Sequence, residues 1–326
     1  SANISYFCRL KQRQIMGISK IKYLFLTIFM ATAIGLSAQN VDSLVVAGDS
    51  LRMIYRFEES LQSYNLALEK AIADSLDSVE KIQERIRYSE NGRNMMAFTD
   101  SPVVEAKHKF SIEDFFLYYP LPDKSWRKTP NQLDSTGTGR FSKALYVPEP
   151  SWEIYYSAED TDGIRNIYMT ELKDTIWTYP SLLNENLTSA SNEIYPMLSP
   201  DGKSLYFASE GLYGMGGYDL YVSNWDYDNK EWSAPVNLGF PYSSPADDFL
   251  LVNTPDGEHT IFASNRDCPS DSVWVYVLEY DDMPVRRPMT DPAELLAIAS
   301  LDPAGAQSDE GAHDVEADVP ENVQKQ

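Results

Sequence analysis

The sequence predicts a mainly β protein made of β-propeller-type blades, preceded by a short helical unit. Tryptophans recur at Trp126, Trp177 and Trp232, which are 51 and 55 residues apart, and each precedes a proline and then a leucine. The turn sequence Pro-Asp-Gly also recurs, at 200–202 and 255–257. Repeats of about 50 residues that hold several short strands are typical of propeller blades.

The repeat also predicts where each blade begins and ends. Pro-Asp-Gly between two runs of strand-forming residues indicates a hairpin, because proline fixes φ and glycine allows a positive φ. We expect blades over 110–290, with complete four-stranded blades at 143–187, 193–245 and 247–290 and a half blade at 114–135. Single-chain propellers usually close with about four to eight blades, so the blade number and ring closure stay open.

The segment 41–98 is predicted to be helical, because its apolar residues recur every three or four positions. Its residue order resembles one tetratricopeptide repeat (TPR), although Leu51 stands in place of the usual tyrosine and Ser60 in place of the usual alanine. One repeat cannot bury its own apolar face, so we expect it to dock on the next domain or on a partner. A plain helical hairpin and a peptide-binding groove are both open. The residues that carry the resemblance are Leu44, Gly48, Leu51, Phe57, Ser60, Tyr64 and Ala67.

An export signal is predicted near the start of the chain. Two lysines precede the apolar run 23–36, which ends in small residues suited to cleavage after Ala38. We therefore interpret 1–38 as upstream residues followed by a signal peptide that starts at Met16, with a single-pass anchor as the alternative. This indicates a periplasmic protein with no membrane span after cleavage, associated with the outer membrane or free of it.

The charge balance excludes several kinds of partner. The net charge is −22, and removing 1–38, with its five basic and no acidic residues, makes it −27. Nucleic acids and anionic lipid surfaces need a basic footprint, so neither is expected as a partner. The end of the chain, 291–326, is predicted to be an acidic disordered tail or linker, although Asp291 to Ser300 could begin a helix.

The blade motifs resemble a known family. The segments 206–209, 214–223 and 262–266, with sequences YFAS, GMGGYDLYVS and FASNR, resemble the PD40 (WD40-like) repeats of exported Bacteroidota proteins. In that group such repeats often follow tetratricopeptide helices. Relatives include scaffold components of type IX secretion and gliding, and more distantly the TolB-like periplasmic propellers. The resemblance implies a propeller fold and export. Its implied partners are envelope proteins or a peptidoglycan-associated complex.

No catalytic, cofactor or metal site is expected. The chain has three histidines, none at metal-ligand spacing, and Cys268 would be the only thiol of the mature chain. Asp226 and Asp228 crowd a turn that could hold calcium, but a solvated hairpin is the favoured interpretation. Asp247 and Asp248 are expected to brace neighbouring blades, with a glycosidase carboxylate pair as the alternative.

These observations predict a non-catalytic binding or scaffold protein that mediates protein–protein interaction in a cell-envelope or secretion-associated assembly. The alternative is a glycan-binding module or a carbohydrate-active propeller enzyme. Exposed aromatic side chains on the loops are the candidates for partner or sugar contacts. They are Tyr213, Tyr218, Trp225, Tyr227 and Tyr242.

Overall fold

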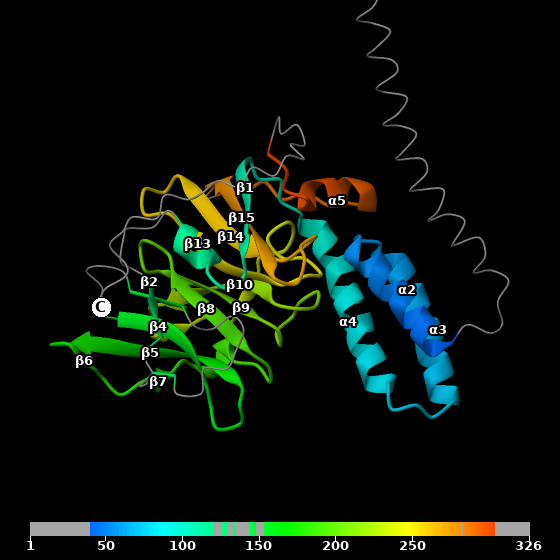
Figure 1. Ribbon diagram of the computed structural model, residues 1–326, viewed down its shortest axis with the longest axis horizontal. Coiled ribbons are helices and arrows are strands. Elements are labelled where there is room, and N and C mark those ends of the chain that lie inside the picture. Colours follow the sequence, from blue (N-terminus) through cyan, green and yellow to red (C-terminus); the bar gives the residue numbers. More distant parts are fainter. Residues whose placement is uncertain are drawn as a thin grey trace, which may run out of the picture.

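The computed structural model describes residues 40–119, 126–129, 133–134, 144–147, 153–281 and 283–303. The predicted leader, 1–38, and the acidic residues after 303 lie outside these described residues. Within them, no helix is long and apolar enough to cross a membrane. The chain forms a unit of three helices followed by antiparallel sheets of about four strands (Figure 1).

The helical unit contains α2 (Val41–Met53), α3 (Phe57–Ala73) and α4 (Val79–Met95), followed by the short 3-10 helix η2 (Met96–Phe98). Helix α2 begins at Asn40, whose side chain accepts a hydrogen bond from the Asp42 amide. The buried residues of each helix lie at helical spacing, as the sequence pattern predicts. Most of them pack between the helices, while Phe57 and Met95 also join a cluster with Phe240 of the following domain.

Two glycines let the helices approach closely. A Cβ atom on Gly48 would lie 2.4 Å from Cε1 of Tyr64, and one on Gly92 would lie 2.4 Å from Cε1 of Phe57. Both aromatic rings are fully buried. Each ring therefore occupies the space that a side chain at the facing glycine would need.

The serine that departs from the TPR pattern has a buried partner. The Ser60 hydroxyl lies 2.8 Å from the Ser89 hydroxyl of α4, and it also donates to the carbonyl of Phe57. Because both hydroxyls are satisfied inside the helix contact, burying them carries little penalty. Ser60 thus has a second serine, Ser89, as its hydrogen-bond partner. The residue pattern of a single repeat does not predict this partner.

The β region contains fifteen named strands in four sheets among the described residues. Strands β4, β5, β6 and β7 form one sheet, β8 to β12 a second, and β13, β14, β15 and β1 a third, while β2 pairs only with β3. Every pair of named strands among the described residues is antiparallel. The strands are β1 (Val104–Ser111), β2 (Trp126–Lys128), β3 (Ala144–Tyr146), β4 (Glu153–Glu159), β5 (Arg165–Lys173), β6 (Ile176–Trp177), β7 (Ser181–Leu182), β8 (Glu193–Leu198), β9 (Ser204–Ser209), β10 (Asp219–Asp226), β11 (Glu231–Trp232), β12 (Val236–Asn237), β13 (Asp248–Asn253), β14 (His259–Ser264) and β15 (Ser272–Glu279).

The predicted tryptophan repeat is present in the two middle sheets. Trp177 pairs with Leu172 in one hairpin, and Trp232 pairs with Trp225 in the equivalent hairpin of the next sheet. After each tryptophan the chain leaves the sheet and returns as a short outer strand, β7 or β12. The proline that follows each tryptophan lies between the two short strands, where no ladder hydrogen bond is needed.

The inner strands of the last two sheets share a bulge. The register of β8 shifts between Ile194 and Met197, and that of β13 shifts between Phe249 and Val252. Within the shifts, Tyr195 and Leu250 have a φ of 51°. A bulge at the same place in two strands indicates that both sheets are built on one repeating backbone pattern.

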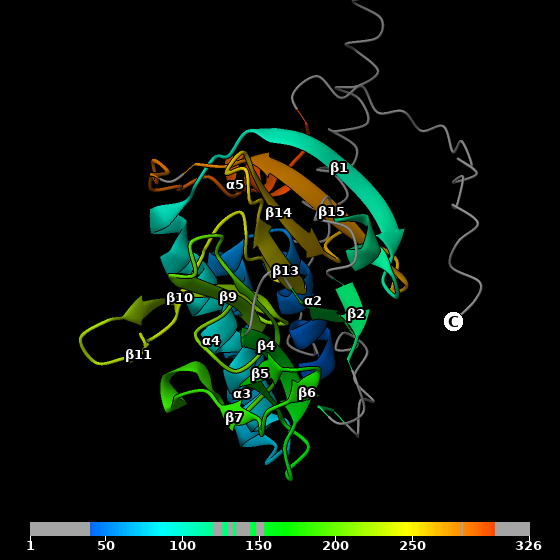
Figure 2. The same cartoon turned by 90° about the vertical axis from the view of Figure 1, so that its left-hand side faces the viewer.

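The last sheet is completed by an N-terminal strand, which corrects the predicted blade boundaries. Strand β1 pairs with β15 over Val104–Ser111, most of which precedes the predicted 110–290 region, and curves over it as the outer strand (Figure 2). The residues 280–290, expected to complete this blade, contain no named strand among those described. The expected half blade, 114–135, also differs from the prediction. Its described residues contain the 3-10 helix η3 (Phe115–Tyr118) and one strand, β2.

The largest core cluster lies between the inner strands of the last two sheets. Phe115 is fully buried there, with its ring centroid 5.3 Å from that of Phe249 and 6.2 Å from that of Tyr195. Tyr119 donates a hydrogen bond from its hydroxyl to the Leu250 carbonyl. The segment after β1 therefore closes the space between β8 and β13.

The start of the predicted tail, 291–326, is a helix, which was the alternative interpretation of Asp291 to Ser300. Residues Pro292–Ala299 form helix α5, capped by the Asp291 side chain, and both Leu295 and Ala299 are buried. Helix α5 packs on the junction between the helical unit and the sheets. The helix forms because its apolar residues are buried, although the sequence after it is acidic.

Replacing Gly48 with alanine should destabilise the protein by about 1–3 kcal/mol, because the new methyl group overlaps the buried ring of Tyr64. The measurement is urea unfolding followed by circular dichroism. Asn65→Ala on the exposed face of α3 is the control and should have little effect. Equal stability of Gly48→Ala and wild type would show that the helices can separate at this contact.

Candidate functional site

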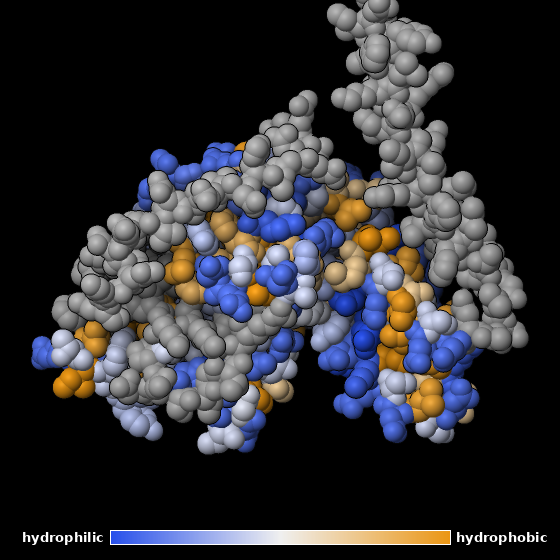
Figure 3. Space-filling view, in the orientation of Figure 1, coloured by the Kyte–Doolittle hydropathy of each residue, from blue (hydrophilic) through white to orange (hydrophobic). Residues whose placement is uncertain are grey.

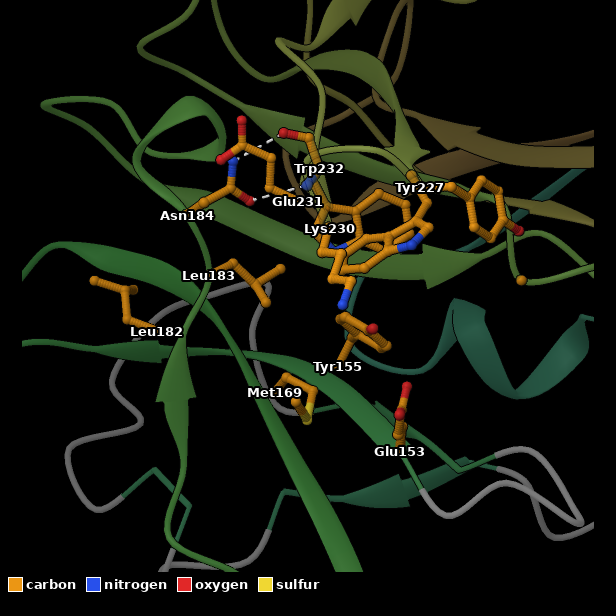
Figure 4. A pocket seen from close by; sticks show the side chains of 12 residues that line it. Glu153, Tyr155, Met169, Leu182, Leu183, Asn184, Tyr227, Lys230, Glu231 and Trp232 are labelled. Carbon is orange, nitrogen blue, oxygen red and sulfur yellow. Dashed lines mark hydrogen bonds between the residues drawn. The ribbon is translucent and has the colours of Figure 1, made fainter.

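A surface groove of about 490 Å³ lies between the two middle sheets (Figure 4). This volume is within the range of roughly 300–1,000 Å³ that is usual for ligand sites. One side comes from β4, β5 and the β7 segment, and the other from the β10–β11 hairpin. The lining residues are Glu153, Tyr155, Met169, Leu182, Leu183, Asn184, Gly202, Trp225, Tyr227, Lys230, Glu231 and Trp232.

Trp232 forms the fixed floor of the groove. Its ring is buried with Phe207 and Tyr221 of the same sheet. Asn184 accepts a hydrogen bond from the Trp232 amide at 3.3 Å and donates one to its carbonyl at 2.8 Å. The side chain of Asn186 also donates to that carbonyl. Both backbone polar groups of Trp232 are therefore occupied by the neighbouring sheet.

Two further aromatic rings stand against this floor. Trp225 meets Trp232 edge to face with centroids 5.3 Å apart, and Tyr155 does so at 6.1 Å. Both Trp225 and Tyr155 are half-buried, so part of each ring faces the groove. Burial raises the pKa of Tyr155 to about 12, and the charge of Glu153 adds to the shift. Tyr155 thus keeps its proton across the physiological range.

The β10–β11 hairpin holds the rim of the groove. Asp226 accepts hydrogen bonds from the amides of Asp228 and Asn229, and from the Asn229 side chain at 2.7 Å. These bonds use the Asp226 carboxylate to shape the turn, in agreement with the hairpin interpretation of this acidic cluster. Tyr227 is 66% exposed at the rim, and Lys230 extends from the same turn.

Two of the five predicted aromatic contact residues, Trp225 and Tyr227, lie in this groove, and the other three do not. Tyr218 is buried, at 7% exposure, which contradicts its expected exposure. It precedes β10 and packs in the core cluster between the last two sheets. Tyr242 is half-buried, with its hydroxyl 3.4 Å from Asp100. Tyr213 is 53% exposed and lies at the helical junction, where its hydroxyl accepts from Asn94.

Glycine-rich loop 213–217 is more than a link between β9 and β10, because it docks on the helical unit. Arg52 of α2 donates to the carbonyl of Met215, and Asn91 of α4 donates to that of Gly214 at 2.8 Å. Gly216 has a φ of 111°, and a Cβ there would lie 2.5 Å from Nη1 of Arg52. The surface between α2 and α4 is therefore filled by this chain's own loop.

Apolar packing strengthens the same junction. Met215 is fully buried among Tyr55, Phe57 and Phe240, and the ring centroids of Tyr55 and Phe240 lie 5.5 Å apart. Leu295 of α5 joins this cluster. The helical unit thus docks on the following domain, one of the two outcomes that the incomplete repeat predicts.

The carboxylates at the start of β13 are structural, as the bracing interpretation predicts. Arg266 pairs with the buried Asp248, whose other oxygen accepts from Ser244. Asp247 accepts from the amide of Tyr218 and from the Asn265 side chain. Neither acid lines the groove.

Other polar groups offer weaker candidates for chemistry. The ligand atoms of Asp256, Glu258 and His259 lie within 4.8 Å of one another at an exposed turn. Asp256 is used in that turn, and His259 Nε2 lies 2.9 Å from Glu105 of β1. This arrangement joins β1 to the β13–β14 hairpin.

Burial raises the pKa of Cys268, which makes its reactive thiolate scarcer.

Comparisons with known proteins do not assign a family. No family model matches the sequence, and no curated protein matches it. Among the solved structures similar to this chain is one described as "Crystal structure of a thermostable family-43 glycoside hydrolase". The match covers 46% of this chain and 76% of the other, with 13% sequence identity and a TM-score of 0.25. At these values the similarity carries no conclusion about activity.

Replacing Arg266 with methionine should destabilise the protein by about 3–5 kcal/mol, because Asp248 would stay buried without its partner. The double variant Asp248→Asn, Arg266→Met should be more stable than Arg266→Met alone. Denaturant unfolding of the three proteins measures both effects. A double variant less stable than Arg266→Met would contradict the charge-pair explanation.

The Asp219 carboxyl should make stability fall as pH rises. Burial raises its pKa well above the usual range, and the charge of Asp248 adds to the shift. The protonated form is therefore favoured in the folded state, so this stability is complete below about pH 4 and is lost as pH rises through the folded-state pKa. Asp219→Asn should lose less unfolding free energy than wild type between pH 4 and pH 7 in urea titrations. Parallel curves for the two proteins would contradict this.

Proposed function

We propose that this protein is a non-catalytic scaffold that binds protein partners in a periplasmic, cell-envelope assembly. The observation that carries the proposal is the fixed join between two kinds of module. Loop 213–217, the Tyr55–Phe57–Phe240 cluster and α5 hold the helices against the sheets. Two modules of interaction-prone types in one fixed arrangement suit a protein that positions partners.

The sequence supports the compartment and the family proposed. The export pattern in 1–38 favours the periplasm. The blade motifs resemble PD40 repeats, which in exported Bacteroidota proteins occur in scaffold components of secretion and gliding. The buried acids at Asp219 and Asp248 are used in packing and loop support rather than held in a cavity, which favours binding over catalysis.

The surface proposed for the protein partner is the outer face of the helical unit. The side between α2 and α4 is filled by loop 213–217, so a partner would use the other side. Apolar residues run along the surface of this unit (Figure 3). The exposed apolar side chains of α2 and α3 include Val46, Leu66 and Ile72. Contiguous exposed apolar patches on a protein surface are typical of interaction sites.

The test is affinity purification of the tagged protein from the envelope fraction after mild crosslinking. We expect the variant Val46→Asp, Leu66→Asp to lose its reproducible protein partners by about tenfold or more in recovered amount, while keeping its melting temperature. Val236→Asp, on the exposed strand β12, is the matched control and should retain them. Deleting the helices would be a poor variant, because it would expose Phe240 and Met215.

Two results would contradict the proposal. One is the absence of any protein recovered with wild type beyond the level of an unrelated tagged control. The other is the release of reducing ends from envelope glycans by the purified protein, which would make it an enzyme.

A further inference from the structure

We propose that the groove between the two middle sheets binds a neutral oligosaccharide of pyranose rings. This activity goes beyond the scaffold role and does not depend on it, since the groove and the outer helical face are separate surfaces.

The groove offers aromatic surface in a form that suits sugar rings. Trp225 and Tyr155 each meet Trp232 edge to face, and both are half-buried residues that line the groove, so part of each ring is open to a ligand. Tyr227 adds an exposed ring at the rim. The C–H bonds on one face of a pyranose stack on aromatic rings, while its hydroxyls stay at the edge.

Polar side chains surround these rings. Glu153 and Glu231 are acceptors, and Lys230 is a donor on the same hairpin as Tyr227. Sugar hydroxyls both donate and accept, so a rim with both kinds of group can bind them. In Figure 4, Lys230 points from the hairpin toward Tyr155, across the space that a ligand would occupy.

The backbone of the groove argues against an added peptide strand. A peptide that extends a sheet needs unpaired amide and carbonyl groups on the strand it joins. At Trp232 both groups are already bonded to Asn184. The amide of the next residue, Ser233, donates to the Asn224 carbonyl. Along this edge of the groove, recognition therefore comes from side chains, which the aromatic and charged lining supplies.

The charge of the groove selects among sugars. Its ionisable lining groups are two carboxylates, one lysine and the tyrosines, and the whole chain has a net charge of −22. An anionic polysaccharide would meet repulsion both in the groove and on approach. A neutral oligosaccharide avoids this cost, because it brings only hydroxyl or acetamido groups to the rim.

The experiment is calorimetric titration of the full chain with cello-hexaose and with N-acetylated chito-hexaose. We expect saturable binding of at least one of these neutral sugars, and none of an oligogalacturonate of the same length. Tyr227→Ala should weaken that binding by about fivefold to tenfold, as loss of one stacking ring predicts. Tyr280→Ala, an exposed tyrosine of the last sheet, is the control and should bind like wild type.

Trp225→Phe tests the same point with a smaller ring and should also weaken binding, with melting temperatures recorded for each variant. The proposal is overturned if neither neutral sugar binds, if folded Tyr227→Ala binds as wild type does, or if the oligogalacturonate binds as tightly. Competition by a proline-rich peptide for the same ring side chains, without sugar binding, would assign the groove to a peptide instead.

Discussion

The buried ion pair between Arg266 and Asp248 is the contact on which most of this structure depends. Besides Asp248, the guanidinium donates to the carbonyls of Pro241, Tyr242 and Ala299. One side chain thereby joins the inner strand of the last sheet, the loop after β12 and the end of α5. Burying a charge this deeply is costly unless its hydrogen bonds are satisfied, and here the carbonyls satisfy them. The loop held by Arg266 also carries Phe240, which the helical unit packs against.

The preceding sheet also buries an acid at the start of its inner strand, but no arginine pairs with it. Ser189 and Ser209 both donate to Glu193, as Ser244 does to Asp248 in the last sheet. The residue two positions after Ser209 is Gly211, where a Cβ would lie 2.0 Å from Oγ of Ser189. A side chain at this position would collide with Ser189, so the arginine of the last sheet has no counterpart here. Burial raises the pKa of Glu193, whose main partners are neutral hydroxyls. Both sheets thus hold a buried acid with a nearby serine hydroxyl, and the last sheet adds the connection to α5.

Local patterns in the sequence predicted much of the fold. The helical spacing of 41–98, the Pro-Asp-Gly hairpins and the tryptophan repeat correspond to observed elements because each depends on nearby residues. Strand β1 and the burial of Tyr218 were not predicted. Nothing near Val104–Ser111 indicates that its partner is β15, and an aromatic residue after a glycine-rich loop resembles an exposed one until its packing is known.

The candidate groove was predicted only in part, for the same reason. Trp225 and Tyr227 stood out because they are aromatic and next to an acidic turn. Tyr155, Glu153 and Asn184 come from the neighbouring sheet, and their relation to Trp232 follows from the packing of two blades. The docking of loop 213–217 on α2 and α4 has no sequence signal beyond its glycines, which fit a tight turn equally well.

Strand β1 also sets an order of events during synthesis. Its last residue, Ser111, pairs with Ser272, so the strand leaves the ribosome 161 residues before its partner. At about 5–20 residues per second, it stays without its native neighbour for roughly 8–30 seconds. An unpaired strand of this length is a hazard for association with other chains. Lys107, His108 and Lys109 lie in its middle, and such polar and charged side chains oppose that association. In the finished sheet the same lysines lie over the ring of Trp274, so the charges that oppose association of the nascent strand are then used in packing.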